Sequence, residues 1–240
     1  MINNIFKKIF VLLCFCLGLN DPYVAGNKTS NHFSYLNKFK HIKSWVLIDV
    51  GAHTGTFANR VTRILDISEI ILLEPNTEHT TKLKDSFPSA TVIDAAVSLN
   101  AGQAYYVRHS KNSGQNFISE SIASNEVVAT ISINTLFSKI QNSNGTILLK
   151  IDIEGNELNI LQDLSRVYFN NIGLISVEIL PTLDTFNFFD DLCKFIPANF
   201  MFYRETRYGM IPVSREKPHW SDRLNLSQNF LLVNNDLINS

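Results

Sequence analysis

Beyond residue 44, apolar and polar positions alternate between the periods of strands and helices. The short apolar runs WVLIDV, EIILLEP and TVIDAAV are typical of buried strands. After the first run, Phe57, Val61, Ile64 and Leu65 recur at the spacing of one helix face, and after the second, Asn76 can cap another helix. The first half of the chain therefore predicts repeated strand–helix units.

The second half continues this pattern after an interruption. TILLKIDIEG, LISVEIL, FMFYRE and NFLLVN predict strands, and NELNILQDL and FNFFDDLCKF predict helices. Between residues 98 and 144, GQAYYVRH and VVATISIN alternate around the polar stretch SKNSGQN, which predicts an inserted hairpin. The whole pattern predicts an α/β fold: a doubly wound, mostly parallel sheet with helices on both faces and this hairpin.

Length and charge limit the classes of protein. A chain of 240 residues can form one α/β domain, and we predict a single domain over residues 45–240 after a basic and apolar segment, residues 1–44. The 21 basic and 22 acidic residues nearly cancel, so there is no overall field for nucleic acid, and we expect no nucleic-acid partner. The segment 1–44 holds six lysines and one acid, which favours an anionic surface.

The N-terminal segment leaves alternatives open. Lys7 and Lys8 precede the apolar run Ile9–Leu19, which is about half the length of a membrane-spanning helix. It resembles a secretory signal with a poor cleavage site near Ala25; we favour a helix that packs on the domain or rests on a membrane surface. The three cysteines have neither metal nor disulfide spacing, so a cytoplasmic protein is expected, with peripheral membrane contact through residues 1–44 as an option.

The stretch LIDVGAHTGTF suggests a ligand loop at the end of the first strand. Asp49 ends the strand, Gly51 and Gly55 permit tight turns before a helix, and His53 lies between them. The loop lacks the G-x-G-x-x-G spacing of dinucleotide sites and the lysine of a P-loop. Because an acid repels phosphate but accepts from an ammonium group, S-adenosylmethionine fits this loop better than NAD does.

Acids after the next two strands extend this hypothesis. Glu74, at the end of the second strand, can accept both hydroxyls of a ribose. Asp94, or the backbone of Ala95 and Ala96 after the third strand, is expected beside the adenine. The predicted cofactor site thus spans three neighbouring strand ends.

LLKIDIEGNE places charges where a central strand should be apolar. Lys150, Asp152 and Glu154 have period two and are expected to share one face, where they either form an ion-pair network or border a wet cleft. Glu178, near another strand end, can join them. Asp152, Glu154 and Glu178 offer oxygen ligands for magnesium, but without a fixed ligand spacing we predict no metal site.

Together, LIDVGAHTGTFA, LLEPN, DAAVS, LLKIDIEGNELNIL and LISVEIL resemble the FkbM-type S-adenosylmethionine-dependent methyltransferases, over residues 46–180. The resemblance implies a class I, Rossmann-like methyltransferase in which Asp49, Gly51 and Glu74 bind the cofactor. It also implies methyl transfer to a hydroxyl, often on a sugar or secondary metabolite, beside Lys150 and its two acids. Phe137 stands where the family usually has an acid.

In-line methyl transfer needs alignment and a base for the hydroxyl proton. We expect Asp152 or Glu154 as the base with Lys150 orienting it, and rank His109 behind them. The polar insertion Lys111–Phe117 is expected to cover a small-molecule or glycan acceptor.

Three other functions stay open. A non-catalytic cofactor-binding module is one, and the phenylalanine in place of the family's acid favours it. An exported interaction domain is the second; its glycan sites would be Asn27, Asn144 and Asn225. An NAD-dependent oxidoreductase is the third, weakened by the missing middle glycine.

Overall fold

The computed structural model describes residues 30–107, 117–119, 126–140, 145–179, 188–206, 209–216 and 228–238. The signal-like run in residues 9–19 and most of the polar insertion lie outside these ranges. So do His109 and the asparagines Asn27, Asn144 and Asn225. In the described part, no helix is long and apolar enough to cross a membrane.

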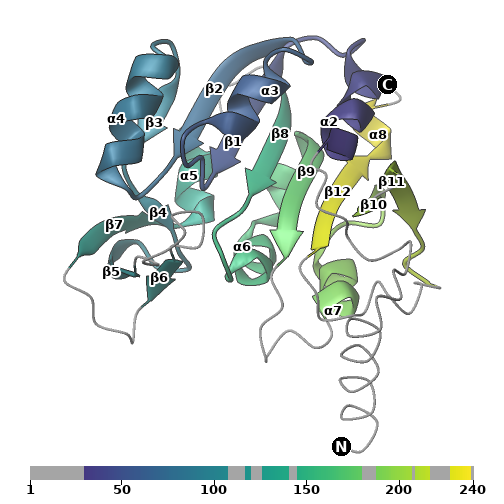
Figure 1. Ribbon diagram of the computed structural model, residues 1–240. Coiled ribbons are helices and arrows are strands. Elements are labelled where there is room, and N and C mark those ends of the chain that lie inside the picture. Colours follow the sequence, from purple (N-terminus) through teal and green to yellow (C-terminus); the bar gives the residue numbers. More distant parts are fainter. Residues whose placement is uncertain are drawn as a thin grey trace, which may run out of the picture.

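Eight strands form the main sheet, in the order β11-β10-β12-β9-β8-β1-β2-β3 (Figure 1). Five are mutually parallel: β1 (Trp45–Val50), β2 (Ile67–Leu73), β3 (Thr91–Ile93), β8 (Thr146–Ile151) and β9 (Ile172–Ile179). Antiparallel pairing joins β9 to β12 (Gln228–Asn234), then β10 (Phe200–Thr206), then β11 (Gly209–Val213). The predicted α/β fold is confirmed, but one side of the sheet is antiparallel, because β12 lies between β9 and β10 and pairs antiparallel with both.

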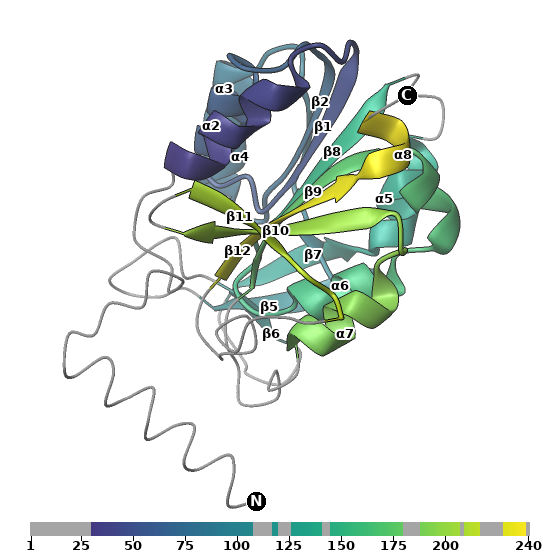
Figure 2. The same cartoon turned by 90° about the vertical axis from the view of Figure 1, so that its right-hand side faces the viewer.

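The central strands β1, β8 and β9 are buried on both faces, because helices cover each face of the sheet (Figure 2). On β1, Trp45 and Leu47 join one apolar cluster, whereas Val46, Ile48 and Val50 join the other. The first cluster includes residues of α2 (Ser30–Leu36), α3 (Thr56–Val61) and α4 (Thr77–Ser86). The second includes residues of α5 (Ile133–Lys139), α6 (Glu157–Asp163) and α7 (Phe188–Phe195). Shorter helical turns are η1 (Asn37–Phe39), η3 (Arg166–Asn170) and α8 (Asn235–Ile238).

The insertion is a small four-stranded sheet, not a hairpin. Its order is β4-β7-β5-β6, from β4 (Ala96–Val97), β5 (Gly102–Val107), β6 (Phe117–Ser119) and β7 (Val127–Ile131). The predicted single strand TVIDAAV is wrong, because its first half pairs with β2 and its second half pairs with β7 of the small sheet. In Figure 1 the small sheet lies below the left half of the main sheet. The arrowheads of β1 and β8 point toward this small sheet.

One further prediction of local structure was wrong, and one helix was missed. The helix after β1 ends at Val61, although Leu65 beyond it is still buried. The helix α5 was not predicted, and Phe137 within it is buried with its ring 4.9 Å from that of Tyr168. The position where the family usually has an acid is thus filled by an aromatic core contact.

The described part of the N-terminal segment packs on the domain. Leu36 is fully buried and Phe39 nearly so, and both belong to the cluster that contains Trp45 and Leu47. The helix α2 therefore covers the sheet rather than standing apart from it.

Candidate functional site

The loop after β1 fits tightly between two neighbouring strand ends. The backbone N–H groups of Gly51 and Ala52 donate to the Leu73 carbonyl at the end of β2, at 3.0 and 2.9 Å. Gly51 has φ +77°, and a Cβ there would overlap the carbonyl oxygen of Asp152. Gly51 is therefore needed to bring this loop against the loop after β8.

Unlike Gly51, Gly55 lies against side chains of the neighbouring helix rather than against the loop after β8. It is the N-cap of α3, with φ +80°, and a side chain there would overlap the side chains of Leu83 and Phe87. It lines neither of the two cavities described below. Its place in the structure is thus a packing position between α3 and α4, behind the predicted ligand loop.

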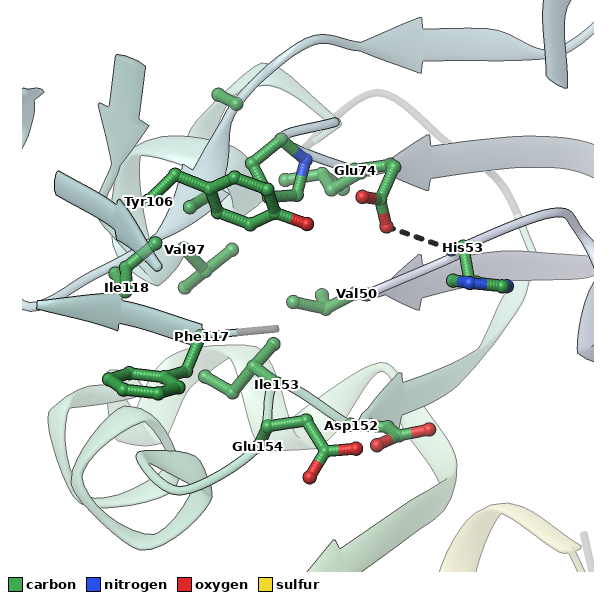
Figure 3. A pocket seen from close by; sticks show the side chains of 15 residues that line it. Val50, His53, Glu74, Val97, Tyr106, Phe117, Ile118, Asp152, Ile153 and Glu154 are labelled. Atoms are coloured by element: carbon green, nitrogen blue, oxygen red, sulfur yellow. Dashed lines mark hydrogen bonds between the residues drawn. The ribbon is translucent and has the colours of Figure 1, made fainter. Parts of the chain in front are cut away.

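A first cavity of about 270 Å³ lies at the carboxyl ends of β1, β2 and β8 (Figure 3). The small sheet closes it on one side with apolar side chains, and acids border it elsewhere. Of the described residues that line it, none is lysine or arginine. Its labelled wall residues are Val50, His53, Glu74, Val97, Tyr106, Phe117, Ile118, Asp152, Ile153 and Glu154.

Glu74 is the best organised acceptor in this cavity. Its side chain is buried, and its two carboxylate oxygens accept from the backbone N–H groups of His53 at 2.9 Å and Asn76 at 3.0 Å. Burial raises the pKa of this carboxyl, and those two N–H groups oppose the rise. Each oxygen has a further lone pair for a ligand hydroxyl. Asn76 also caps α4, as predicted, by accepting from Glu78 N–H.

His53 holds an uncommon backbone conformation beside this carboxylate. Its φ is +50°, and its ring meets the ring of His79 edge-on at 4.1 Å between centroids. Burial, and then the neighbouring His79, lowers the pKa of His53. A mainly neutral imidazole therefore stands in the wall of the cavity at neutral pH.

The structure separates Asp94 from its neighbours. Asp94 is exposed and does not line the cavity, whereas Ala95 and Ala96 do. Of the two sequence-based alternatives for the adenine, the structure therefore brings the alanine pair to the site and leaves the acid outside.

Asp49 lies beneath the site rather than in its wall. Its carboxylate is fully buried, and its Oδ1 lies 3.1 Å from Lys150 Nζ. The two residues are direct partners in the β1–β8 register. Lys150 also donates to the Gly51 carbonyl at 2.6 Å and pairs with Asp152 at 3.3 Å. The predicted network exists, but Lys150 joins Asp49 to Asp152 and not Asp152 to Glu154.

The charge state of Lys150 follows from these contacts. Burial alone would lower the pKa of Lys150, yet the carboxylates of Asp49 and Asp152 together raise it above its ordinary value. Lys150 therefore stays protonated and can orient the Asp152 carboxylate.

The two acids after Lys150 lie in a loop. Because β8 ends at Ile151, the predicted common strand face is wrong for Glu154, which has φ +61°. Burial first, and then the nearby carboxylates led by Asp152, raises the pKa of Glu154 to about 7. Glu157, which sequence analysis did not single out, is buried and its Oε1 accepts from the N–H groups of Ile153 and Gly155 at 3.1 and 3.0 Å. It fixes the loop that carries both acids.

A second cavity, of about 290 Å³, lies between α2 and α3 and the ends of β8, β9, β10 and β12. Its floor is a polar row across the sheet, because Lys150 pairs in register with Ser176, and Glu178 pairs with Asn229. Only Lys150 and Glu178 of this row were noted from the sequence. The lining residues with titratable or amide side chains are His32, His53, Arg60, Lys150, Asp152, Glu178, Glu205 and Asn229.

The two cavities meet. Gly51, His53 and Asp152 line both of them, whereas Glu74 and Glu154 line only the first and Lys150 only the second. Ligands in open α/β sheets bind outside the carboxyl ends of the strands, where this junction lies. In the described part of the chain, no group of three or more His, Cys, Asp or Glu residues is arranged to hold a metal ion.

Comparison with known families decides the classification. The model of the methyltransferase FkbM domain matches residues 49–208, which is more than half of the chain. The chain belongs to the FkbM methyltransferase family. The resemblance inferred from the motifs is thereby confirmed. The sequence has no significant match among curated proteins.

Among solved structures, an FkbM methyltransferase supports the assignment of the fold. An FkbM methyltransferase from Methylobacillus flagellatus KT has 14% identity and a TM-score of 0.50, with 79% of this chain and 43% of that chain covered. This FkbM chain thus spans less than half the length of that relative. A putative rRNA-methylase from Clostridium thermocellum has 10% identity, coverage of 88% and 98%, and a TM-score of 0.47. A precorrin-6y C5,15-methyltransferase from Geobacter metallireducens GS-15 has 13% identity, coverage of 89% and 93%, and a TM-score of 0.41.

The FkbM match contains all of the first cavity but only part of the second. The first cavity is lined by residues 50–154, entirely within the match. The second cavity also receives His32 and Phe33 from before the match and Asn229 from after it. These three residues were not found by sequence analysis, because their chemistry depends on contacts between distant parts of the chain.

Proposed function

We propose that this protein transfers the methyl group of S-adenosylmethionine to a hydroxyl oxygen of a small-molecule or glycan acceptor. The observation that carries the proposal is the junction at Gly51, His53 and Asp152, where a donor in the first cavity and an acceptor in the second can meet. Membership of a methyltransferase family supports the reaction class.

The first cavity suits this cofactor. The carboxylate of Glu74, already held by two N–H groups, has lone pairs for ribose hydroxyls, and the apolar wall can take an adenine. Glu74, Asp152 and Glu154 favour a ligand with positive charge. A dinucleotide would place its pyrophosphate among these acids without a lysine or arginine from the described lining residues, which argues against NAD.

The cofactor would supply a methyl group bonded to a sulfonium, and S-adenosylhomocysteine would leave as an uncharged thioether. The protein must therefore align the acceptor oxygen and take up the proton that its hydroxyl loses. Asp152 lines both cavities and can accept that proton. Lys150, 3.3 Å from Asp152, holds its carboxylate in place. Glu154 faces only the first cavity, so we assign the proton transfer to Asp152.

We test the reaction with S-adenosylmethionine labelled in its methyl group and a pool of uncharged glycosides and polyols. The label should enter a neutral product in a base-stable linkage, because a methyl ether survives alkali and a methyl ester does not. Label found only in base-labile products would contradict transfer to a hydroxyl.

Glu74→Gln should weaken binding of S-adenosylmethionine about 10- to 100-fold, measured by equilibrium dialysis. One oxygen becomes an NH₂ group that faces a backbone N–H, so both the loop contact and a ribose acceptor are lost. Glu78→Gln, an exposed substitution on α4, is the matched control and should bind like the parent. Equal affinity in parent and Glu74→Gln would place the ribose elsewhere.

The pH dependence of cofactor binding should follow Glu154. Because the raised pKa of Glu154 is about 7, its carboxyl is mostly neutral at pH 6 and mostly charged at pH 8. The groups that influence it are Asp152, Glu178, Glu157 and Lys150. As pH rises, the new negative charge should favour the sulfonium of S-adenosylmethionine over uncharged sulfur in S-adenosylhomocysteine, by about 3- to 10-fold.

The ratio of the two dissociation constants is measured from pH 6 to 8 in the parent and in Glu154→Gln, so that titration of the ligands' own amino groups can be subtracted. The ratio should change with pH by about 3- to 10-fold more in the parent than in Glu154→Gln. A parent ratio that does not change with pH, or a variant that changes equally, would exclude Glu154 as the titrating group.

A further inference from the structure

One wall of the second cavity is formed by the helix α2, which lies outside the FkbM match. The helix α2 is tied to the sheet by Glu205, whose Oε1 accepts from the His32 backbone N–H at 3.1 Å. The other oxygen of Glu205 accepts from the Asn229 side chain at 3.1 Å. Glu205 is buried and thus fixes both His32 and Asn229 at the rim of this cavity.

The imidazole of His32 has unused hydrogen-bonding capacity. The residue is 5% exposed, and its Nε2 is buried without a hydrogen-bond partner in the described part of the chain. Its ring lies edge-on to Phe33 and Phe57, with centroids 5.8 and 6.2 Å away. Buried polar atoms are normally paired, so an unpaired nitrogen in a residue that lines a cavity needs an explanation.

Charge in the cavity favours an uncharged ligand. Burial lowers the pKa of His32 to about 4, so the imidazole is neutral at physiological pH and can donate one hydrogen bond and accept another. Asp152, Glu178 and Glu205 oppose the positive charges of Arg60 and Lys150, and Asp49 already matches Lys150. The lining is therefore slightly acidic, which disfavours phosphate and carboxylate groups.

We propose that the second cavity binds an uncharged, hydroxylated ring and that His32 is its specificity-determining residue, through a hydrogen bond to a hydroxyl other than the reacting one. The aromatic rings of Phe33 and Phe57 cover the apolar face of that ring, while Asn229 contacts its edge. This assignment rests on the proposed methyl transfer. It gives a role in acceptor binding to His32, Phe33 and Asn229, which lie outside the FkbM match.

The test follows the histidine side-chain nitrogens of the ¹⁵N-labelled full chain by NMR. His32→Gln assigns the His32 signals, and the exposed His41→Gln is the control. S-adenosylhomocysteine alone should shift His53 and leave His32 unchanged. No response of any histidine would count against the proposed cofactor site, whereas an equal response of His32 would assign the second cavity to the cofactor and overturn the present inference.

With S-adenosylhomocysteine bound, a panel of methyl glycopyranosides (gluco, galacto, manno and rhamno) is added, with methyl glucuronide as the anionic counterpart. At least one uncharged probe should shift His32, and His32→Gln should weaken its binding about tenfold while S-adenosylhomocysteine binds as in the parent. His41→Gln should bind both like the parent. A response to the glucuronide alone, or to none of the uncharged probes, would overturn the inference.

Discussion

Lys150→Met should lower the free energy of unfolding by about 3–5 kcal/mol, because it leaves the Asp49 carboxylate buried without its counter-charge. Asp49 is fully buried, and Lys150 Nζ lies 3.1 Å from its Oδ1 in the strand register. The same change removes the 2.6 Å hydrogen bond to the Gly51 carbonyl, which supports the ligand loop. Urea denaturation followed by circular dichroism measures the loss.

The double variant Asp49→Asn with Lys150→Met should recover most of that stability, since it removes both charges together. Lys84→Met, on the exposed side of α4, is the matched control and should change stability by less than about 0.5 kcal/mol. A decrease in the free energy of unfolding of under about 1 kcal/mol for Lys150→Met would contradict this account. So would a double variant that is less stable than Lys150→Met alone, because the Asp49–Lys150 ion pair would then not stabilise the pairing of β1 and β8.

Asp152→Asn should lower kcat for methyl transfer by about 10²- to 10⁴-fold, the usual contribution of a general base. The amide keeps the size of the side chain but cannot accept the hydroxyl proton. Affinity for S-adenosylmethionine should fall by no more than about 3- to 10-fold, the effect of one negative charge, because Glu74 still provides the main hydrogen-bond acceptor. Single-turnover rates with labelled cofactor separate the chemical step from binding.

Two further variants make this assignment specific. Glu154→Gln should reduce kcat much less than Asp152→Asn, because Glu154 lines only the first cavity. Asp85→Asn, exposed on α4, should leave the rate unchanged. A normal kcat in Asp152→Asn, or a greater loss in Glu154→Gln, would transfer the role of base to another group.

The parts of the fold that follow from local patterns were predictable. The apolar runs located the central strands, and Asn76 marked the start of α4. Gly51 and Glu74 were found because a strand followed by a glycine turn or an acid places these groups at one edge of a parallel sheet. The motif pattern also identified the family.

Features set by contacts between distant segments were not predictable. The alternation through Lys150 and Asp152 continued to Glu154 in the sequence, but the chain leaves the strand at Ile151 and its direction then depends on Glu157. The split of the third strand depends on pairing with β7, since Ala96 and Val97 are apolar in either sheet.

The second cavity shows the same limit more clearly. His32 and Asn229 are far apart in the sequence, and Glu205 accepts a hydrogen bond from each of them. Neither residue has a local motif, so no pattern in the sequence marks them as part of a site. The sequence of β9 contains one indication of a polar site, because Ser176 and Glu178 interrupt an otherwise apolar strand.

The most direct test of the proposed methyltransferase is calorimetric titration of the protein with S-adenosylmethionine and, separately, with NAD. We predict one binding site for S-adenosylmethionine, weakened by Glu74→Gln and retained in Asp152→Asn, and no measurable heat with NAD. A folded protein that binds NAD, or binds S-adenosylmethionine with the same affinity after Glu74→Gln, would contradict the assignment of the first cavity.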